Sequence, residues 1–93
     1  MRYGHLLIDE ERGKAYLLGY DMCLTPTEYK VLCEIARGGK MSLDLLMELC
    51  ELKKSGRGNI PVHVCAINKK AQNIAGRKLV LYGEHNYYIN EFM

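Results

Sequence analysis

The sequence predicts an α+β domain in which an antiparallel strand meander is followed by three helices and a C-terminal β-hairpin. Three observations support this fold class. Short strand patterns precede residue 25, helical patterns with a clear start signal occupy the middle of the chain, and two strand patterns separated by a turn close it. The 93 residues are expected to form one domain, residues 1–93, because a chain of this length builds a single small core.

The N-terminal meander is expected over about residues 5–24. Its apolar runs are short and are separated by glycine-containing turns, which is typical of antiparallel strands. A charged turn ends at Gly13, and a second turn is expected at Gly19-Tyr20-Asp21. The three predicted strands are His5–Asp9, Lys14–Leu18 and Met22–Leu24.

The clearest helix is predicted over about residues 26–37. Thr25 followed by Glu28 forms a capping-box pattern, in which each residue's side chain can bond the other's backbone N–H. Pro26 suits the first helical position because its missing N–H would have no partner there. Gly38-Gly39 is expected to end the helix.

A second helix is predicted over about residues 43–52, after a brief strand at Lys40-Met41. Ser42 is the expected N-cap, because its hydroxyl can accept a backbone N–H of the first turn. A basic connector, KKSGRG, then leads to the third helix. The leucines expected to face inward are Leu45, Leu46, Leu49 and Leu52.

The third helix, predicted over about residues 60–74, has one apolar and one polar face. Its apolar stripe follows the helical period, with Asn59 as N-cap, Pro61 in the first turn and Gly76 after the end. The stripe consists of Ile60, Val64, Ile67 and Ala71. The opposite face carries no carboxylate and consists of Asn59, Val62 or His63, Ala66, Lys69 or Lys70, and Asn73. Such a face is typical of a helix that reads a DNA major groove, although an ordinary amphipathic surface helix has the same pattern.

The terminal hairpin is predicted over about residues 78–90. Arg77 to Tyr82 forms the first strand, Gly83 to Asn86 the turn, and Tyr87 to Ile89 the returning strand. The hairpin and helices are expected to enclose one core. Its predicted members beneath the helices are Tyr29, Leu32, Ile35, Leu46, Leu49, Ile60, Val64 and Ile67.

Composition and motifs exclude several function classes. No apolar run approaches the roughly 20 residues of a membrane span, and the N-terminus is not a signal peptide. The four cysteines lie in apolar patterns without metal-ligand spacing, so we expect reduced, buried thiols, no metal, no cofactor and a cytoplasmic protein. The sequence also lacks a carboxylate pair, a nucleophile elbow and a phosphate-binding glycine loop, so an enzyme is not expected.

Charge is distributed unevenly along the chain. Residues 1–51 hold six basic and nine acidic residues, a net charge of −3, whereas residues 52–93 hold seven basic and two acidic residues, a net charge of +5. The basic half contains the third helix and the hairpin. This asymmetry favours an anionic partner for the C-terminal half, with a solvated basic face as the alternative.

Two stretches resemble a known family. LTPTEYKVL, residues 24–32, is very close to the signature at the start of the first helix in the OmpR/PhoB-type DNA-binding effector domains of bacterial response regulators. VHVCAINKK, residues 62–70, followed by a strand, a turn and Tyr87-Tyr88-Ile89, is similar to that family's recognition helix and wing. The resemblance covers essentially the whole chain and implies a winged helix, a variant of the helix-turn-helix, in which the hairpin is the wing.

The resemblance also implies a function and partners. It implies a DNA-binding transcription regulator of a two-component system, with double-stranded DNA as ligand, RNA polymerase as a further partner and a homodimer as its assembly. No receiver domain fits within the 93 residues. The chain is therefore expected to be either a free-standing domain or the C-terminal piece of a regulator whose receiver domain precedes it.

The residues expected to face DNA come from the recognition helix, the connector before it and the wing. In the resembling family, the positions of His63, Lys69 and Lys70 serve mostly the phosphate backbone. The expected DNA-binding residues are Asn59, Val62, His63, Ala66, Lys69, Lys70 and Asn73 of the helix, Lys53, Lys54 and Arg57 of the connector, and Arg77, Lys78 and His85 of the wing.

The chain departs from the family at several reading positions. The family's helix arginines correspond to Ala66 and Asn68, and the arginine and glycine of its wing correspond to Gly83 and Glu84. Without arginines that read guanine, asparagine contacts to adenine and apolar contacts to thymine methyl groups predict an A·T-rich site. The alternative is a winged-helix protein-interaction module that has lost specific DNA binding, with Tyr82 and Tyr88 as interface residues.

Overall fold

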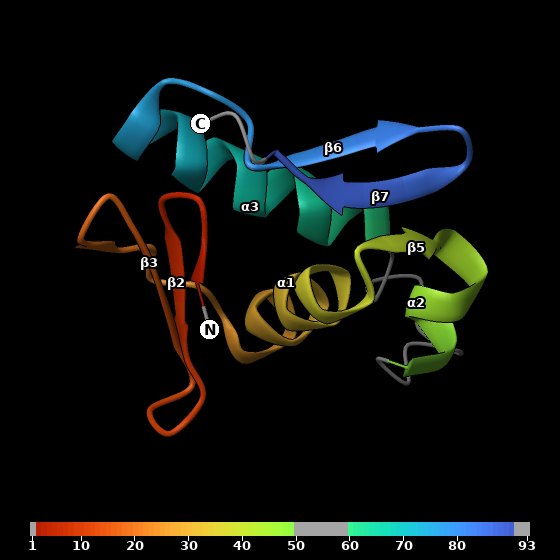
Figure 1. Cartoon of the computed structure of the whole chain (residues 1–93), viewed down its shortest axis with the longest axis horizontal. Helices are drawn as coiled ribbons and strands as arrows, with labels where there is room; N and C mark the ends of the chain where they lie inside the picture. Colours follow the sequence, from red (N-terminus) through yellow and green to blue (C-terminus); the bar gives the residue numbers. More distant parts are fainter. Residues whose placement is uncertain (1, 50–59, 91–93) are drawn as a thin grey trace.

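The computed structural model describes residues 2–49 and 60–90, which form two antiparallel sheets and three helices (Figure 1). The strand meander, the helices and the closing hairpin follow one another in the predicted order, and the α+β architecture is confirmed. The N-terminal sheet has strand order β1-β2-β3-β4, and the second sheet has order β5-β7-β6. Helices α1 and α3 pack against each other between these sheets.

The N-terminal sheet differs from the prediction at its last strand. Its strands are β1 (Arg2–Tyr3), β2 (Leu6–Asp9), β3 (Lys14–Leu17) and β4 (Tyr20–Asp21). The predicted strand Met22–Leu24 and the predicted turn at Gly19-Tyr20-Asp21 are wrong. The turn consists of Leu18 and Gly19, with φ of 52° and 83°, closed by the Leu17–Tyr20 pair. A tight two-residue hairpin of this type requires positive φ at both central positions. Leucine rarely adopts positive φ, so the sequence does not indicate a turn at Leu18.

Helix α1 (Pro26–Gly38) begins with the predicted capping box. The Thr25 hydroxyl accepts the Glu28 backbone N–H at 3.2 Å, and Glu28 Oε1 accepts the Thr25 N–H at 3.1 Å. At the other end, Gly39 has φ of 78° and donates its N–H to the Ile35 carbonyl. Positive φ there carries little cost for glycine, which explains why the helix ends at this point.

Removing the Thr25 hydroxyl should cost measurable stability. Thr25→Ala is expected to lower the free energy of unfolding by about 0.5–2 kcal/mol, because the Glu28 backbone N–H loses its acceptor. Thr25→Asp keeps an acceptor at the same place and should be nearly neutral. Denaturant melts of both variants test this, and equal losses for alanine and aspartate would contradict the capping role.

Helix α2 (Leu43–Leu49) follows β5 (Lys40–Ser42), which confirms the brief strand expected there. Ser42 Oγ accepts the Leu45 N–H at 3.2 Å, as predicted for the cap. The inward leucine stripe is only partly correct, because Leu46 is buried whereas Leu45 and Leu49 are each 41% exposed. Leu43 and Met47, which lie about one helical turn apart, are partly buried instead and pack against the core beside Leu46. Residues 50–52 of the predicted helix, Leu52 included, lie outside the described residues.

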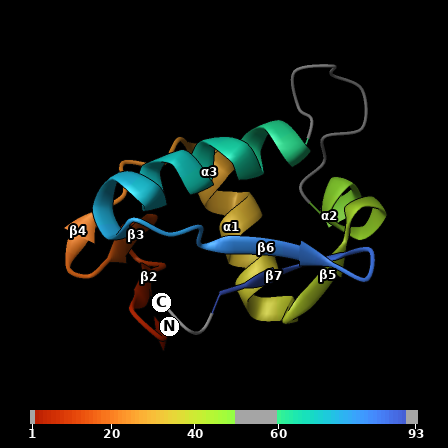
Figure 2. The ribbon, with the colours of Figure 1, turned by 90° about the horizontal axis from the view of Figure 1, so that it is seen from above.

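Helix α3 (Ile60–Ala75) buries the predicted stripe in full. Ile60, Val64, Ile67 and Ala71 are all buried, and α3 packs against α1 (Figure 2). The Gly76 N–H bonds the Gln72 carbonyl, and Gly76 has φ of 72° where the helix ends. The predicted cap, Asn59, lies outside the described residues.

The wing is the hairpin of β6 (Val80–Gly83) and β7 (Asn86–Ile89). Its turn is two residues long, with φ of 52° at Glu84 and 66° at His85, so it is shorter than the turn predicted at Gly83 to Asn86. β5 pairs with β7, which places this turn beside α2 at one end of the molecule (Figure 1). β6 is left at the edge of the sheet, facing α3.

One core joins both sheets and all three helices. Six of the eight predicted core residues are buried: Leu32, Ile35, Leu46, Ile60, Val64 and Ile67. Tyr29 is half-buried and packs against this core, whereas Leu49 is exposed. Among the described residues, no helix combines the length and apolarity needed to cross a membrane.

The cysteines are less buried than their apolar neighbours suggested. Cys33 is buried, but Cys23 and Cys65 are exposed, and these three are free thiols. Cys23 follows β4 at a positive φ, and Cys65 lies on the outer face of α3. Cys50 lies outside the described residues. That all four cysteines are reduced remains a prediction. Mass spectrometry under non-reducing conditions tests it, because each disulfide would lower the mass of the chain by two hydrogens.

Candidate nucleic-acid interface

The outer face of α3 is polar and free of carboxylates, because the helix contains no acidic residue. Its exposed side chains recur every three to four residues and therefore form one strip along the helix. From the N-terminal end, they are Pro61, Val62, Cys65, Lys69, Gln72 and Asn73. Of the predicted face, Val62, Lys69 and Asn73 are fully exposed, and Ala66 is half-buried at the edge of the strip.

A groove of about 370 Å³ separates this helix from the wing. Lys69 lines it from α3, and Lys78 lines it from the segment that leads into β6. Both lysines are exposed, and no carboxylate belongs to the described lining. Two ammonium groups on opposite walls of an open groove form a site that suits a phosphate backbone.

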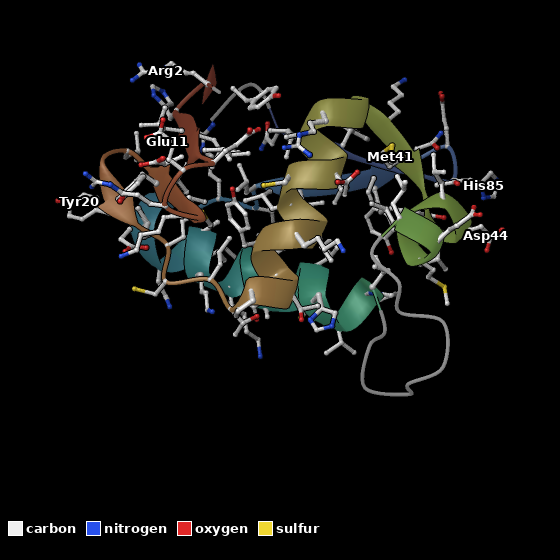
Figure 3. The ribbon with its side chains drawn as sticks, turned by 90° about the horizontal axis from the view of Figure 1, so that it is seen from below. Arg2, Glu11, Tyr20, Met41, Asp44 and His85 are labelled. Carbon is white, nitrogen blue, oxygen red and sulfur yellow. The ribbon has the colours of Figure 1, made fainter. Side chains whose placement is uncertain are left out.

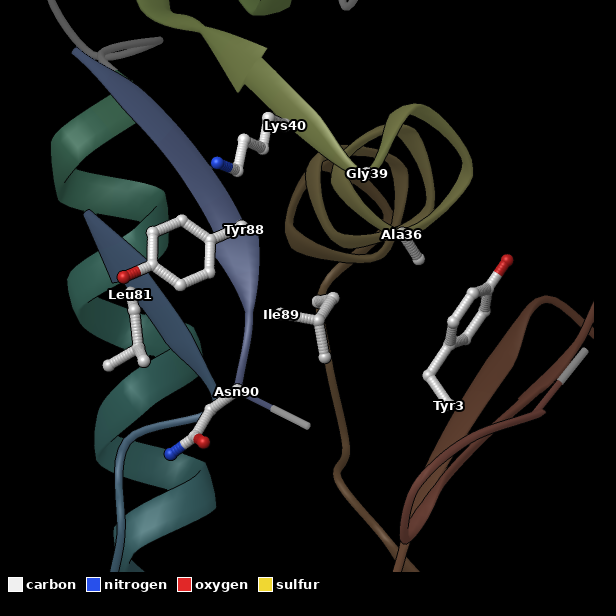
Figure 4. Close-up of a pocket in the computed structure, with 8 residues that line it drawn as sticks. All are labelled: Tyr3, Ala36, Gly39, Lys40, Leu81, Tyr88, Ile89 and Asn90. Atoms are coloured by element: carbon white, nitrogen blue, oxygen red, sulfur yellow. The ribbon is translucent and has the colours of Figure 1, made fainter. Parts of the chain in front are cut away.

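A larger cavity lies elsewhere and has different chemistry. It measures about 410 Å³ and lies between the N-terminal sheet, the end of α1 and the outer side of the wing (Figure 4). Tyr3, Leu81, Tyr88 and Ile89 give it a mainly apolar lining, and Lys40 is its one cation among the described residues. For a polyanion, the smaller groove with two lysines is therefore the better site.

Lys70 does not belong to the outer face. Its ammonium lies 2.6 Å from Glu28 Oε1 and 2.9 Å from the Cys23 carbonyl oxygen. Consecutive residues of a helix point about 100° apart, so Lys69 faces the groove while Lys70 faces α1. This ion pair ties α3 to the start of α1, and we leave Lys70 out of the proposed interface.

Opposing influences set the pKa of the Glu28 carboxyl. Burial raises it, but hydrogen bonds from Lys70 and from the Thr25 N–H, together with the charges of Lys70 and His63, lower it below its ordinary value. The ionised carboxylate is therefore the form that the fold favours. Its contribution to stability is present above the ordinary glutamate pKa of about 4.3 and is lost as the pH falls through the lower, folded value.

Glu28→Gln should therefore be destabilising in a pH-dependent way. At pH 7, we expect a loss of about 1–2 kcal/mol, which is modest for a charged hydrogen bond because the Lys70 side chain is 31% exposed. The difference from wild type should shrink below about pH 4. Denaturant melts across pH measure it, with Glu10→Gln, which removes an exposed pair with Arg37, as the control. A difference that is constant from pH 7 to pH 3 would contradict the assignment.

The remaining residues predicted to contact DNA differ in exposure and lie in different parts of the molecule. His63 is half-buried, and its Nε2 atom is buried without a hydrogen-bond partner among the described residues. Arg77 and Lys78 are exposed at the base of the wing, whereas His85 is exposed at its tip. His85 follows Glu84 at the end of the molecule where α2 lies, so the tip carries a carboxylate next to the imidazole (Figure 3). Asn59, Lys53, Lys54 and Arg57 lie outside the described residues.

Sequence reasoning missed three exposed residues of the strip and the role of a fourth residue, Asn68. Pro61, Cys65 and Gln72 all line the groove, and the signal for them was helical spacing: Pro61 lies four residues before Cys65, which lies four before Lys69, and Gln72 lies three after Lys69. At Asn68, the resemblance indicates only the loss of an arginine. Its side chain instead forms hydrogen bonds to the backbone of Leu79 and Val80.

The fold has a close counterpart among solved structures. The DNA-binding domain of the response regulator AdeR, solved in complex with an intercistronic region, superposes with a TM-score of 0.81 at 20% identity, and the match covers 96% of each chain. No protein-family model and no curated protein matches the chain. The structural likeness confirms, at the level of the fold, the winged helix that the two sequence motifs implied. Residues 2–49 and 60–90 contain no cluster of His, Cys, Asp and Glu that could hold a metal ion.

Proposed function

We propose that this chain is the DNA-binding domain of a transcription regulator, with the outer strip of α3 in a major groove and a phosphate backbone in the groove beside the wing. The observation that carries the proposal is the pair of exposed lysines, Lys69 and Lys78, on opposite walls of a groove without carboxylates. The winged-helix fold, shared with a domain solved in complex with an intercistronic region, supports it.

In this arrangement, the two ends of α3 have different roles. Residues near the N-terminus of a recognition helix reach base edges, whereas later residues lie nearer the backbone. Val62, Cys65 and Ala66 are in the first half, and their apolar groups suit thymine methyl groups. Lys69, Lys78 and Arg77 supply phosphate contacts. The expected preference is for A·T-rich duplexes, with affinity that comes mainly from phosphates.

The family resemblance supports further parts of this proposal. Asn59, Lys53, Lys54 and Arg57 would contact DNA. RNA polymerase and a receiver domain would be partners, and the assembly would be a homodimer in the cytoplasm.

One observation favours a second function, a winged-helix module that binds protein. The tip of the wing carries the acidic Glu84, and Tyr82 beside it is 57% exposed. A carboxylate disfavours entry of the tip into a phosphate-lined groove, whereas exposed tyrosines are frequent in protein interfaces. DNA binding would then be weak or absent.

A mobility-shift experiment with mixed genomic duplexes at two salt concentrations separates these functions. If the chain neutralises phosphates, the affinity should fall steeply between about 50 mM and about 200 mM salt. A protein-interaction module should shift no duplex at either concentration, and that result would overturn the DNA-binding proposal.

A further inference from the structure

We propose that Asn68 is a positioning residue that sets the distance between α3 and the wing, so that the contribution of Lys78 to DNA binding depends on Asn68. This inference rests on the proposed function, since it concerns how the two walls of the proposed phosphate-binding groove are held relative to each other. It starts from the hydrogen bonds of one half-buried side chain.

Both the oxygen and the nitrogen of the Asn68 side-chain amide form hydrogen bonds to the wing. Its Oδ1 atom accepts the backbone N–H groups of Leu79, at 3.0 Å, and Val80, at 2.9 Å. Its Nδ2 atom donates to the Val80 carbonyl oxygen at 3.0 Å. Three hydrogen bonds therefore join the middle of α3 to the start of β6. An amide is suited to this task because it carries a donor and an acceptor in one plane.

The position of β6 explains why these bonds matter. β6 is an edge strand, so the backbone groups on its outer side lack a strand partner. Asn68 satisfies both the N–H and the carbonyl of Val80, much as a neighbouring strand would. On the inner side, the Asn90 N–H bonds the Leu79 carbonyl at 2.7 Å. The start of the wing is thus fixed from two directions.

Lys78 is attached directly to this fixed segment. Its carbonyl accepts Asn90 Nδ2 at 3.1 Å, and the next two residues are the ones that Asn68 holds. On α3, Lys69 follows Asn68 immediately. The side chain of Asn68 therefore connects the two walls of the groove at the level of its two lysines. A binding site works best when the groups behind its contact residues hold them in place.

The bonds to Leu79 and Val80 require an acceptor at position 68. A side chain with donors only, such as arginine, could not receive these two N–H groups. Asn68→Asp keeps the acceptor for both N–H groups and removes the donor, and Asn68→Ala removes all three bonds.

A double-mutant cycle on a mixed-sequence duplex tests the dependence. In the otherwise wild-type chain, Lys69→Ala and Lys78→Ala should each lower the salt slope of log affinity by about one unit. In the Asn68→Ala background, Lys78→Ala should lower it by less than about 0.3 units, while Lys69→Ala keeps its full effect. Lys69 is the matched control because it lies on α3 and does not depend on the clamp.

A second readout needs no DNA. Hydrogen exchange of the Leu79 and Val80 amides should accelerate at least about tenfold in Asn68→Ala, and less in Asn68→Asp, while the Tyr88 amide stays unchanged. Unchanged exchange at Leu79 and Val80, or independent effects of Asn68→Ala and Lys78→Ala on the salt slope, would overturn the inference. Absence of duplex binding by the wild type would overturn the proposed function instead, and the exchange experiment would still decide whether Asn68 fixes the wing. If Asn68→Ala fails to fold, Asn68→Leu, which keeps the approximate size of the side chain but has no hydrogen-bonding group, takes its place in both measurements.

Discussion

Ile67→Ala is expected to lower the free energy of unfolding by about 2–5 kcal/mol. Ile67 is fully buried on the face of α3 that contributes to the shared core. Truncation removes apolar contacts and leaves a cavity that the surrounding helices fill only in part. Denaturant melts measure the loss. Val62→Ala, on the same helix but at a residue that is 58% exposed, should stay within about 0.5 kcal/mol of wild type.

A small effect of Ile67→Ala would contradict the packing of α3. If the loss is under about 1 kcal/mol, the apolar stripe does not occupy the core as the structure has it. The orientation of the outer strip would then be wrong as well, because both faces belong to one rigid helix.

Ala66→Arg should change which sequences the domain prefers. Ala66 lies half-buried beside the exposed strip, in the half of α3 nearer its N-terminus. A long arginine stem can pass over the apolar neighbours and present its guanidinium to a base edge. A new contact to guanine is worth about 1–3 kcal/mol, which corresponds to roughly 5- to 150-fold discrimination at one position. Selection from a randomised duplex library should therefore show a guanine that wild type does not require.

Asn73→Arg is the control for charge. Asn73 is exposed near the end of α3, where recognition helices lie closer to the backbone than to bases. Its extra charge should raise the affinity for all sequences alike. If Ala66→Arg and Asn73→Arg act in the same way, residue 66 does not face base edges.

Features set by neighbours in sequence could be predicted well. The capping box needs only Thr25 and Glu28, three residues apart, and both of its bonds form. The stripe from Ile60 to Ala71 follows from the helical period and is buried throughout. By contrast, the position of β4 depends on a leucine at positive φ, a conformation that side chains rarely adopt. The exposure of Leu45 and Leu49 was not predicted, because the several leucines of α2 allow more than one apolar stripe.

The candidate site was less predictable because its decisive contacts are distant in sequence. Lys69 and Lys70 look equivalent in the sequence, and the partner that separates them, Glu28, lies 42 residues from Lys70. Asn68 finds its partners 11 and 12 residues later, across the turn into β6. Hydrophobic periodicity reports which face of a helix is buried, but it does not report which polar groups meet across two elements.

The salt dependence of duplex binding, measured for wild type and for the Lys69→Ala/Lys78→Ala double variant, tests the central claim most directly. The two lysines line opposite walls of the groove, so removing both should reduce the slope of log affinity against log salt by about two units. Lys30→Ala, at an exposed lysine of α1 outside the groove, should leave the slope unchanged. A double variant with the wild-type slope would show that no phosphate backbone lies between α3 and the wing.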